Sequence, residues 1–319
     1  MRYRRLGRCG MQVSVVGFGS WLTAKRHGQP RADELHRAAY ESGVNFFDTA
    51  NTYGNGETES LVATALAPFR RDTYVLATKV YFPYGEHPFP GVNDRGLSRK
   101  HIFEQCHRSL RELRTDYIDL YQCHRFDEGV PLEETCRAMA DLVAQGKVLY
   151  WGVSQWTAEQ IRDAVAVCED HDWPAPVSDQ PQYNMLQRRI EDDVLPTCME
   201  LGLGVVVYSP LAEGILTGKY RLNQDAPRDS RAADDLQGQW IRKKLTRENL
   251  ERVEALLNLA DGLGLKLSQL AVAWCLRRPE LSSCIIGASK VEQLSENLRG
   301  AEADLDPDVL DRINVILGE

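Results

Sequence analysis

The sequence predicts a (β/α)8 barrel with a short N-terminal β-hairpin and extra C-terminal helices. Eight short apolar segments alternate with segments of helical periodicity, which indicates parallel strands joined by helices. Ionisable and polar residues stand at or just past the last position of several strands, the end where such barrels place their functional groups. Barrels of 319 residues form single domains, so we expect one domain over residues 1–319.

The predicted strands follow the apolar segments in order. A hairpin is predicted over residues 2–14, with glycines at positions 7 and 10 of its turn. The barrel strands are predicted at residues 15–19, 45–48, 74–79, 117–121, 149–153, 177–180, 205–208 and 284–287.

The predicted helices carry start and stop signals. Ser98 is a candidate N-cap, Pro131 opens a helix, and the segment 157–160 has the spacing of a capping box. Gly202 ends the helix before the seventh strand. Helices late in the chain are predicted around residues 250–257, 267–274, 294–301 and 307–317.

Two other nucleotide-binding patterns fit the sequence poorly. A doubly wound sheet needs a Gly-rich turn after its first strand, and Leu22 stands where the third glycine belongs. A Walker loop would need one more residue in the segment 214–219, and Tyr220 follows where Ser or Thr belongs. The barrel therefore remains the better prediction.

Composition and charge narrow the possible functions. The chain is 43% hydrophobic and 26% charged, as in soluble globular proteins. Its net charge is −8, from 46 acidic and 38 basic residues, and basic residues cluster only at Arg2, Arg4 and Arg5. We therefore expect no nucleic-acid partner. Apolar runs stay well below about 18 residues, so we expect no membrane insertion.

The cysteines and histidines argue against a metal centre. None of the eight cysteines is paired at C-x-x-C spacing, and several fall on predicted apolar helix faces. This usage favours a reducing compartment, so we predict a cytoplasmic protein without a metal site. The seven histidines also lack the spacing of a metal-dependent hydrolase. The sequence leaves open whether the chain forms a homo-oligomer.

The segment 45–54 carries the strongest functional signal. Asp48 ends the second predicted strand, and Tyr53 follows in the loop. Lys79 ends the third strand, where a lysine without a partner would be costly, and Asp48 is its natural partner. His124 lies just past the fourth strand. All four side chains are thus predicted at one mouth of the barrel.

This set suits proton donation to a carbonyl oxygen. A phenol with a pKa near 10 is a weak acid at pH 7, and an ammonium held by a carboxylate favours the phenolate. An imidazole can bind the substrate oxygen, and an organic cofactor would supply the electrons. Two alternatives stay open: Asp48 and Lys79 form a purely structural ion pair, or His124 is an ordinary loop histidine.

Three motifs resemble the signatures of the aldo-keto reductase family, namely Phe47-Asp48-Thr49-Ala50-x-x-Tyr53-Gly54, Ala77-Thr78-Lys79 and Asp119-Leu120-Tyr121-Gln122-x-His124. The resemblance runs from residue 3 to residue 317. It implies the barrel, an NADP(H) cofactor, and reduction of small carbonyl substrates. It also implies that Tyr53 is the general acid, that Lys79 and Asp48 tune it, and that His124 orients the substrate.

The resemblance further implies a cofactor site. Ser154 and Gln180 are expected to hold the nicotinamide amide, and Tyr208 to stack on its ring. The remaining expected cofactor-binding residues are Ser209, Pro210, Leu211, Gly214, Lys219, Arg231, Gly287, Ser289, Lys290, Gln293, Glu296 and Asn297. The polar segment 221–244 is expected to be a loop that folds over the pyrophosphate, with Lys219 and Arg231 as charge partners.

The substrate pocket is the least specific part of the prediction. Trp21, Tyr81, Phe82 and Trp156 are expected to line it, with core packing as the alternative for each. Within the family, the chain looks most like the branch of potassium-channel β subunits and their bacterial reductase relatives. Those subunits typically have Asn at the position of His124, so His124 favours a working reductase. The alternative is a cofactor-sensing module that regulates a membrane partner.

Overall fold

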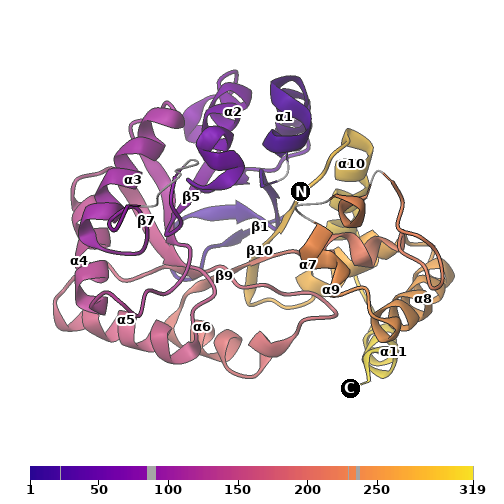
Figure 1. The fold of residues 1–319 in the computed structure, drawn as a ribbon. Helices are drawn as coiled ribbons and strands as arrows, with labels where there is room; N and C mark the ends of the chain where they lie inside the picture. The colour runs from indigo at the N-terminus through magenta and orange to yellow at the C-terminus, as the bar shows by residue number, and fades with distance from the viewer. Residues whose placement is uncertain (22, 85–90, 229, 235–237, 319) are drawn as a thin grey trace.

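Parallel strands close a barrel in the computed structural model, which describes residues 1–21, 23–84, 91–228, 230–234 and 238–318. The barrel strands are β3 (Val16–Gly19), β4 (Phe46–Asp48), β5 (Val75–Val80), β6 (Ile118–Cys123), β7 (Val148–Val153), β8 (Ser178–Asp179), β9 (Gly204–Tyr208) and β10 (Leu281–Ile286). They follow one another around the barrel in chain order, and β10 pairs with β3 to close it. The predicted (β/α)8 architecture is confirmed (Figure 1).

Helices link the strands and cover the outside of the barrel (Figure 1). The described α-helices are α1 (Thr23–Glu41), α2 (Glu57–Leu66), α3 (Arg99–Glu112), α4 (Leu132–Ala144), α5 (Ala158–Asp170), α6 (Val194–Leu201), α7 (Gly238–Arg242), α8 (Arg247–Gly262), α9 (Leu267–Leu276), α10 (Val291–Arg299) and α11 (Pro307–Leu317). Short 3-10 turns are η1 (Tyr53–Gly56), η2 (Arg71–Thr73), η3 (Arg189–Glu191), η4 (Ala212–Thr217), η5 (Arg231–Ala233) and η6 (Gly300–Glu302). Among these described helices, none is long and apolar enough to cross a membrane.

Local signals position several helices as predicted. The Ser98 hydroxyl accepts a hydrogen bond from the backbone N–H of His101 at 3.2 Å, which caps α3. Thr157 and Gln160 exchange both hydrogen bonds of a capping box at the start of α5. Gly202 ends α6 with a φ of 76°, a conformation that glycine adopts without strain.

Two predicted elements differ from the structure. The sixth strand is only Ser178–Asp179, because Pro181 soon after it has no N–H to donate. Helix α1 begins at Thr23 and contains a kink at Gly28, where φ is 64°. The segment 221–244, predicted as a loop, contains η5 and α7, and it buries Ile241 completely. Apolar residues in this polar segment therefore pack against the fold.

Side-chain alternation builds a polar layer over an apolar floor inside the barrel. The floor combines side chains from the strands and the hairpin: Leu6, Val13, Phe46, Val75, Ala77, Leu120, Val206 and Ile285. Successive side chains on a strand point to opposite faces, so every second residue faces inward. Two residues beyond Phe46, Ala77, Leu120 and Val206 stand Asp48, Lys79, Gln122 and Tyr208. The strand pattern alone thus brings four polar side chains to one end of the barrel.

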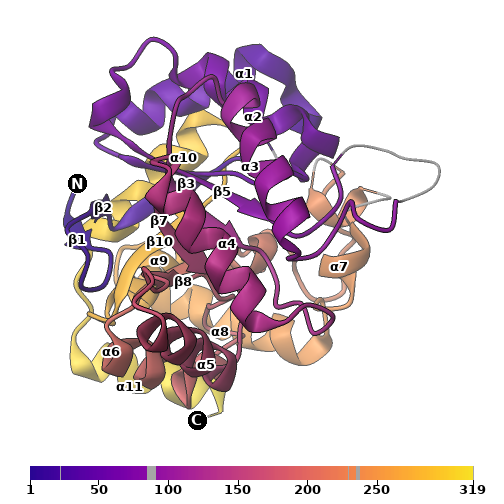
Figure 2. The same cartoon turned by 90° about the vertical axis from the view of Figure 1, so that its left-hand side faces the viewer.

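The predicted N-terminal hairpin closes the other end. It consists of β1 (Tyr3–Arg5) and β2 (Gln12–Ser14), which pair antiparallel. The Arg4 guanidinium donates to the carbonyl oxygens of Leu276, Arg278 and Leu281 at 2.6–2.9 Å, which ties the hairpin to the start of β10. Figure 2 shows the hairpin at one end of the molecule and α7 at the other.

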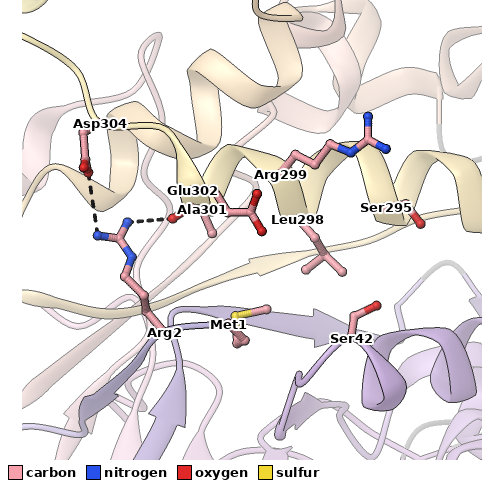
Figure 3. A pocket seen from close by; sticks show the side chains of 9 residues that line it. All are labelled: Met1, Arg2, Ser42, Ser295, Leu298, Arg299, Ala301, Glu302 and Asp304. Carbon is pink, nitrogen blue, oxygen red and sulfur yellow. Dashed lines mark hydrogen bonds and ion pairs between the residues drawn. The ribbon is translucent and has the colours of Figure 1, made fainter.

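A cavity of about 390 Å³ lies beside the hairpin, away from the polar layer (Figure 3). Its lining is formed by Met1, Arg2, Ser42, Ser295, Leu298, Arg299, Ala301, Glu302 and Asp304. The Arg2 guanidinium bonds the Ala301 carbonyl oxygen at 2.7 Å and lies 3.7 Å from the Asp304 carboxylate. This cavity therefore shares no residue with the predicted site. Arg2, the Ala301 carbonyl oxygen and Asp304 in its lining already interact with one another.

Candidate active site

Asp48 and Lys79 form a buried ion pair at the open end of the barrel. The Lys79 ammonium donates to the Asp48 Oδ2 at 2.5 Å and to the Thr49 carbonyl oxygen at 2.8 Å. Lys79 is 0% exposed and Asp48 is 5% exposed. An ammonium has three donors, and the Tyr53 hydroxyl lies 3.5 Å from the same nitrogen. The structure thus brings Lys79, from the third predicted strand, together with Asp48 and Tyr53 of the segment 45–54.

The second oxygen of Asp48 is held by two amides. Gln180 Nε2 donates to Asp48 Oδ1 at 2.9 Å, and Gln122 Nε2 approaches it at 3.4 Å. The two amides also contact each other at 3.3 Å. Sequence reasoning missed Gln122, although its place two residues after the inward-facing Leu120 could have revealed it. These donors fix the carboxylate, and the carboxylate in turn fixes Lys79.

Tyr53 begins the turn η1 and faces the ion pair. Its ring centre lies 5.9 Å from that of His124 and 6.4 Å from that of Trp21. Burial, and then the negative charge of Asp48, raise the pKa of the Tyr53 phenol above its ordinary value, against a smaller opposing effect of Arg125. Burial is the largest of these effects, so the phenol is a weaker acid here than an ordinary tyrosine. Tyr53 carries its proton at neutral pH and can act as a donor.

His124 is a neutral imidazole beside Tyr53. It is 8% exposed, and its ring also contacts Phe82, with ring centres 5.1 Å apart. Burial, followed by the positive charges of Lys79 and Arg125, lowers the pKa of His124 well below its ordinary value. Within the described chain, its buried Nδ1 has no hydrogen-bond partner. A neutral ring with one N–H can hydrogen-bond a carbonyl oxygen without adding charge.

The side of the polar layer formed by β7, β8 and β9 holds three predicted cofactor residues. Ser154 Oγ donates to the Gln180 carbonyl oxygen at 2.8 Å. The Tyr208 hydroxyl accepts from Gln155 Nε2 at 2.9 Å, and Gln155 Oε1 accepts from Arg189 at 3.2 Å. The Tyr208 ring is therefore anchored at its hydroxyl and partly exposed. Sequence reasoning did not single out Gln155.

The turn after β9 contains the next group of predicted cofactor residues. Ser209 has a φ of 53°, and its carbonyl oxygen accepts from Asn184 Nδ2 at 2.9 Å. Pro210 and Leu211 lead from it into η4. Gly214 has a φ of 102°, and a Cβ there would lie 3.1 Å from the Lys219 ammonium. The Lys219 ammonium therefore lies close to the Gly214 backbone, and a cation at this place fits an anionic group.

Arg231 reaches the same open end from far along the chain. Its guanidinium carbon lies 5.3 Å from the centre of the Trp21 ring, just past β3. The segment 221–244 therefore extends to the mouth of the barrel. This placement is compatible with the predicted lid, which stays a prediction.

The start of α10 contains the predicted phosphate site. The backbone N–H and the hydroxyl of Ser289 both donate to Gln293 Oε1, at 3.0 and 2.9 Å. Lys290 is exposed and makes no side-chain cap at this nine-residue helix. Backbone N–H groups at a helix start together with an ammonium fit a phosphate. Gly287 precedes them near the Gly19 carbonyl oxygen, at the same end of the barrel.

One predicted residue of α10 is already paired, and another is buried. Glu296 accepts from the Ser268 hydroxyl at 2.7 Å and pairs with Lys266 at 3.0 Å. Asn297 is 4% exposed. Their roles toward a cofactor stay predictions.

The predicted substrate residues divide into two groups. Trp21 is 43% exposed beside Tyr53, and Phe82 packs edge-on against Tyr81 and His124. Trp156 is only 2% exposed and packs on Phe126 with ring centres 4.8 Å apart, within the main hydrophobic core. Trp21, Tyr81 and Phe82 therefore lie at the mouth of the barrel, and Trp156 lies in the core. Substrate binding by all four residues stays a prediction.

Over the residues with described positions, no group of three or more His, Cys, Asp or Glu side chains could hold a metal ion.

A parallel barrel with Tyr, Lys, Asp and His side chains gathered at its open end defines a barrel oxidoreductase. More particularly, the chain belongs to the aldo/keto reductase family, whose model matches residues 15–317. It is 40% identical to proteins named "Probable voltage-gated potassium channel subunit beta" from Arabidopsis thaliana and from Oryza sativa subsp. japonica, over 99% of this chain and 97% of each relative. A third, "Putative voltage-gated potassium channel subunit beta" from Schizosaccharomyces pombe, is also 40% identical, over 99% of this chain and 93% of the relative. The predicted family and branch are confirmed.

Proposed function

We propose that the chain is an NADPH-dependent reductase of aldehydes and ketones, with Tyr53 as the general acid. The observation that carries this proposal is the Lys79 ammonium, which contacts Asp48 at 2.5 Å and the Tyr53 hydroxyl at 3.5 Å. NADPH, when bound, supplies the hydride that the carbonyl carbon accepts. The protein supplies the proton and the fixed dipoles.

Each residue of the set has a defined part in proton transfer. Tyr53 donates its proton to the carbonyl oxygen, and the third N–H of Lys79 stabilises the phenolate that remains. Asp48, held by Gln122 and Gln180, keeps the Lys79 ammonium in place. His124 donates a hydrogen bond from its neutral ring to the same carbonyl oxygen.

The cofactor would be held by residues from three parts of the open end. Ser154, Gln180 and Tyr208 lie beside the ion pair, where the nicotinamide must meet the substrate. The donors around Gly214 and Lys219 suit the pyrophosphate, and those around Ser289 and Lys290 suit the 2′-phosphate of the adenosine. The separate group of donors for a 2′-phosphate supports NADP(H) over NAD(H), because NAD(H) lacks that phosphate.

Several further properties belong to the same proposal. We propose one domain over residues 1–319, a cytoplasmic location, and small carbonyl compounds as the substrates. The family match over residues 15–317 supports the single domain. The eight cysteines are all free thiols, which supports a reducing compartment.

Steady-state NADPH oxidation by purified protein with small aldehydes tests the proposal directly. We expect saturable oxidation with one alcohol formed for each NADPH consumed. Tight NADPH binding without turnover across a panel of aldehydes and ketones would instead support a second candidate, a cofactor-sensing regulatory module. The names of the channel-subunit relatives motivate that candidate.

His124→Asn should lower turnover by about 10- to 100-fold, since one hydrogen bond to an oxygen that gains charge is worth about 1.5–3 kcal/mol. NADPH affinity should change little, because His124 contacts Tyr53 and Phe82 rather than the residues assigned to the cofactor. Turnover and a fluorescence titration with NADPH measure the two effects. A large loss of NADPH affinity with turnover intact would contradict the assignment.

Lys290→Met should raise the Michaelis constant for NADPH by about 10-fold and leave that for NADH nearly unchanged. The reason is that Lys290 is exposed at the start of α10, where its charge can reach a 2′-phosphate. Lys100→Met, which removes an exposed lysine paired with Glu104 on α3, is the matched control. Equal constants for NADPH and NADH in the unaltered protein would refute the cofactor preference.

A further inference from the structure

Arg125 is a partly buried cation at the open end of the barrel, directly after His124. Its guanidinium donates a hydrogen bond to the His124 carbonyl oxygen, and its central carbon lies 5.7 Å from the centre of the Phe82 ring. The Phe82 ring centre in turn lies 5.1 Å from that of His124. One aromatic ring therefore separates a fixed positive charge from the His124 imidazole.

The charge of Arg125 acts on the groups proposed for the reaction. Burial is the largest influence on the pKa of His124, of Lys79 and of Tyr53. Arg125 is a further cause in each case, and it lowers the pKa every time. The same holds for the pKa of Tyr208. A substrate that reaches Tyr53 therefore also lies within the field of Arg125.

No carboxylate of the described residues forms an ion pair with Arg125. Three carboxylates at this end of the barrel have other partners. Asp48 pairs with Lys79 at 2.5 Å, and Glu213 pairs with Lys244 at 2.5 Å. Asp127 accepts from backbone N–H groups of Leu97 and Gly129 at 2.8 and 3.0 Å. Among the described residues, Arg125 thus has no carboxylate partner, and its charge is open to an anion from outside.

We propose that Arg125 binds a carboxylate of the substrate, and that the preferred substrates are carbonyl compounds with a carboxylate about one aromatic ring away from the carbonyl group. This inference rests on the proposed reductase function. A guanidinium binds a carboxylate through two parallel N–H donors, and partial burial strengthens the attraction. The exposed Trp21 ring and the half-buried Phe82 ring suit the apolar body between the two groups.

The test compares aldehydes that differ only in charge. The substrates are 3- and 4-formylbenzoate and their methyl esters, and the readout is the ratio of kcat/KM for the acid to that for the ester. In the unaltered protein we expect at least one acid to be preferred. Arg125→Met should reduce its acid-to-ester ratio by about 10- to 100-fold. Using the ratio cancels losses that affect both substrates equally.

Two further variants keep the result interpretable. Arg125→Lys retains the positive charge and should keep part of the acid preference, even if Arg125→Met folds poorly. Arg137→Met removes a surface arginine that pairs with Asp141 on α4, so it changes the net charge equally without touching the mouth. It should leave the ratio unchanged. High salt should weaken the acid preference of the unaltered protein.

Three results would overturn the inference. The first is that the protein turns over both the acids and the esters, but the acid-to-ester ratio of every Arg125 variant equals that of Arg137→Met. The second is a loss of NADPH affinity in Arg125→Met that accounts for the whole kinetic effect, which would assign the charge to the cofactor. The third is no reduction of any acid or ester, in which case the proposed function fails as well. Only the third result affects both proposals.

Discussion

Tyr53→Phe should lower the turnover number by about 10²–10⁴-fold, the usual worth of a positioned general acid. The substitution keeps the ring, which packs near Trp21 and His124, and removes only the hydroxyl that faces the Lys79 ammonium. NADPH affinity should hardly change, since no cofactor contact is assigned to this hydroxyl. Steady-state kinetics and an NADPH titration measure both quantities.

Tyr121→Phe is the matched control for this experiment. Tyr121 is fully buried, and its hydroxyl donates to the Ile102 carbonyl oxygen at 3.2 Å, on the side of β6 that faces the helices. Its loss should cost about 1 kcal/mol of stability and leave turnover nearly unchanged. A fully active Tyr53→Phe protein would contradict the proposed mechanism. It would instead favour the alternative that Asp48 and Lys79 form a purely structural ion pair.

Strand periodicity made most of the barrel and its polar end predictable. Asp48 and Lys79 stand at or near the ends of apolar strands, and parallel strands of a barrel bring their carboxyl ends together. An inward lysine needs a counter-charge, so the pair Asp48–Lys79 could be predicted before its distance was known. The alternation of side chains along a strand would also have found Gln122, because it stands two residues after the inward-facing Leu120.

Details that depend on the tilt of strands and on tertiary packing could not be predicted. Periodicity does not say which strands face each other across the barrel, so the bond from Gln180 to Asp48 was not foreseen. The short helix α7 lies in a polar segment with a weak apolar pattern. The direction of the Tyr53 pKa shift could not be predicted either, because its largest cause is burial, which depends on tertiary packing.

Glu59 illustrates a group whose environment is invisible in the sequence. An acidic residue in the first turn of a helix is usually solvent-exposed, yet Glu59 is 0% exposed and accepts from the Thr78 hydroxyl at 2.6 Å. Burial is the main cause that raises the pKa of Glu59 to about 7. Thr78 precedes Lys79 on β5, so a second buried carboxyl lies directly behind the proposed site.

Lys79→Met should lower the turnover number about as much as Tyr53→Phe does, and it should also destabilise the fold. The Tyr53 hydroxyl loses the ammonium that would stabilise its phenolate, and Asp48 is left buried without a counter-charge. Removing one partner of a buried pair typically costs about 3–5 kcal/mol. The amide donors Gln122 and Gln180 still bond Asp48, which places the expected loss at the lower end.

Two double variants separate the chemical role of Lys79 from its structural role. Tyr53→Phe/Lys79→Met should be no slower than the slower single variant, because both substitutions remove one proton-donating unit. Asp48→Asn/Lys79→Met removes both charges, so it should regain much of the free energy of unfolding and none of the turnover. Urea unfolding and kinetics on the folded proteins measure the two. If stability and turnover recover together in Asp48→Asn/Lys79→Met, the pair acts only as a structural element, since a neutral methionine cannot support a phenolate.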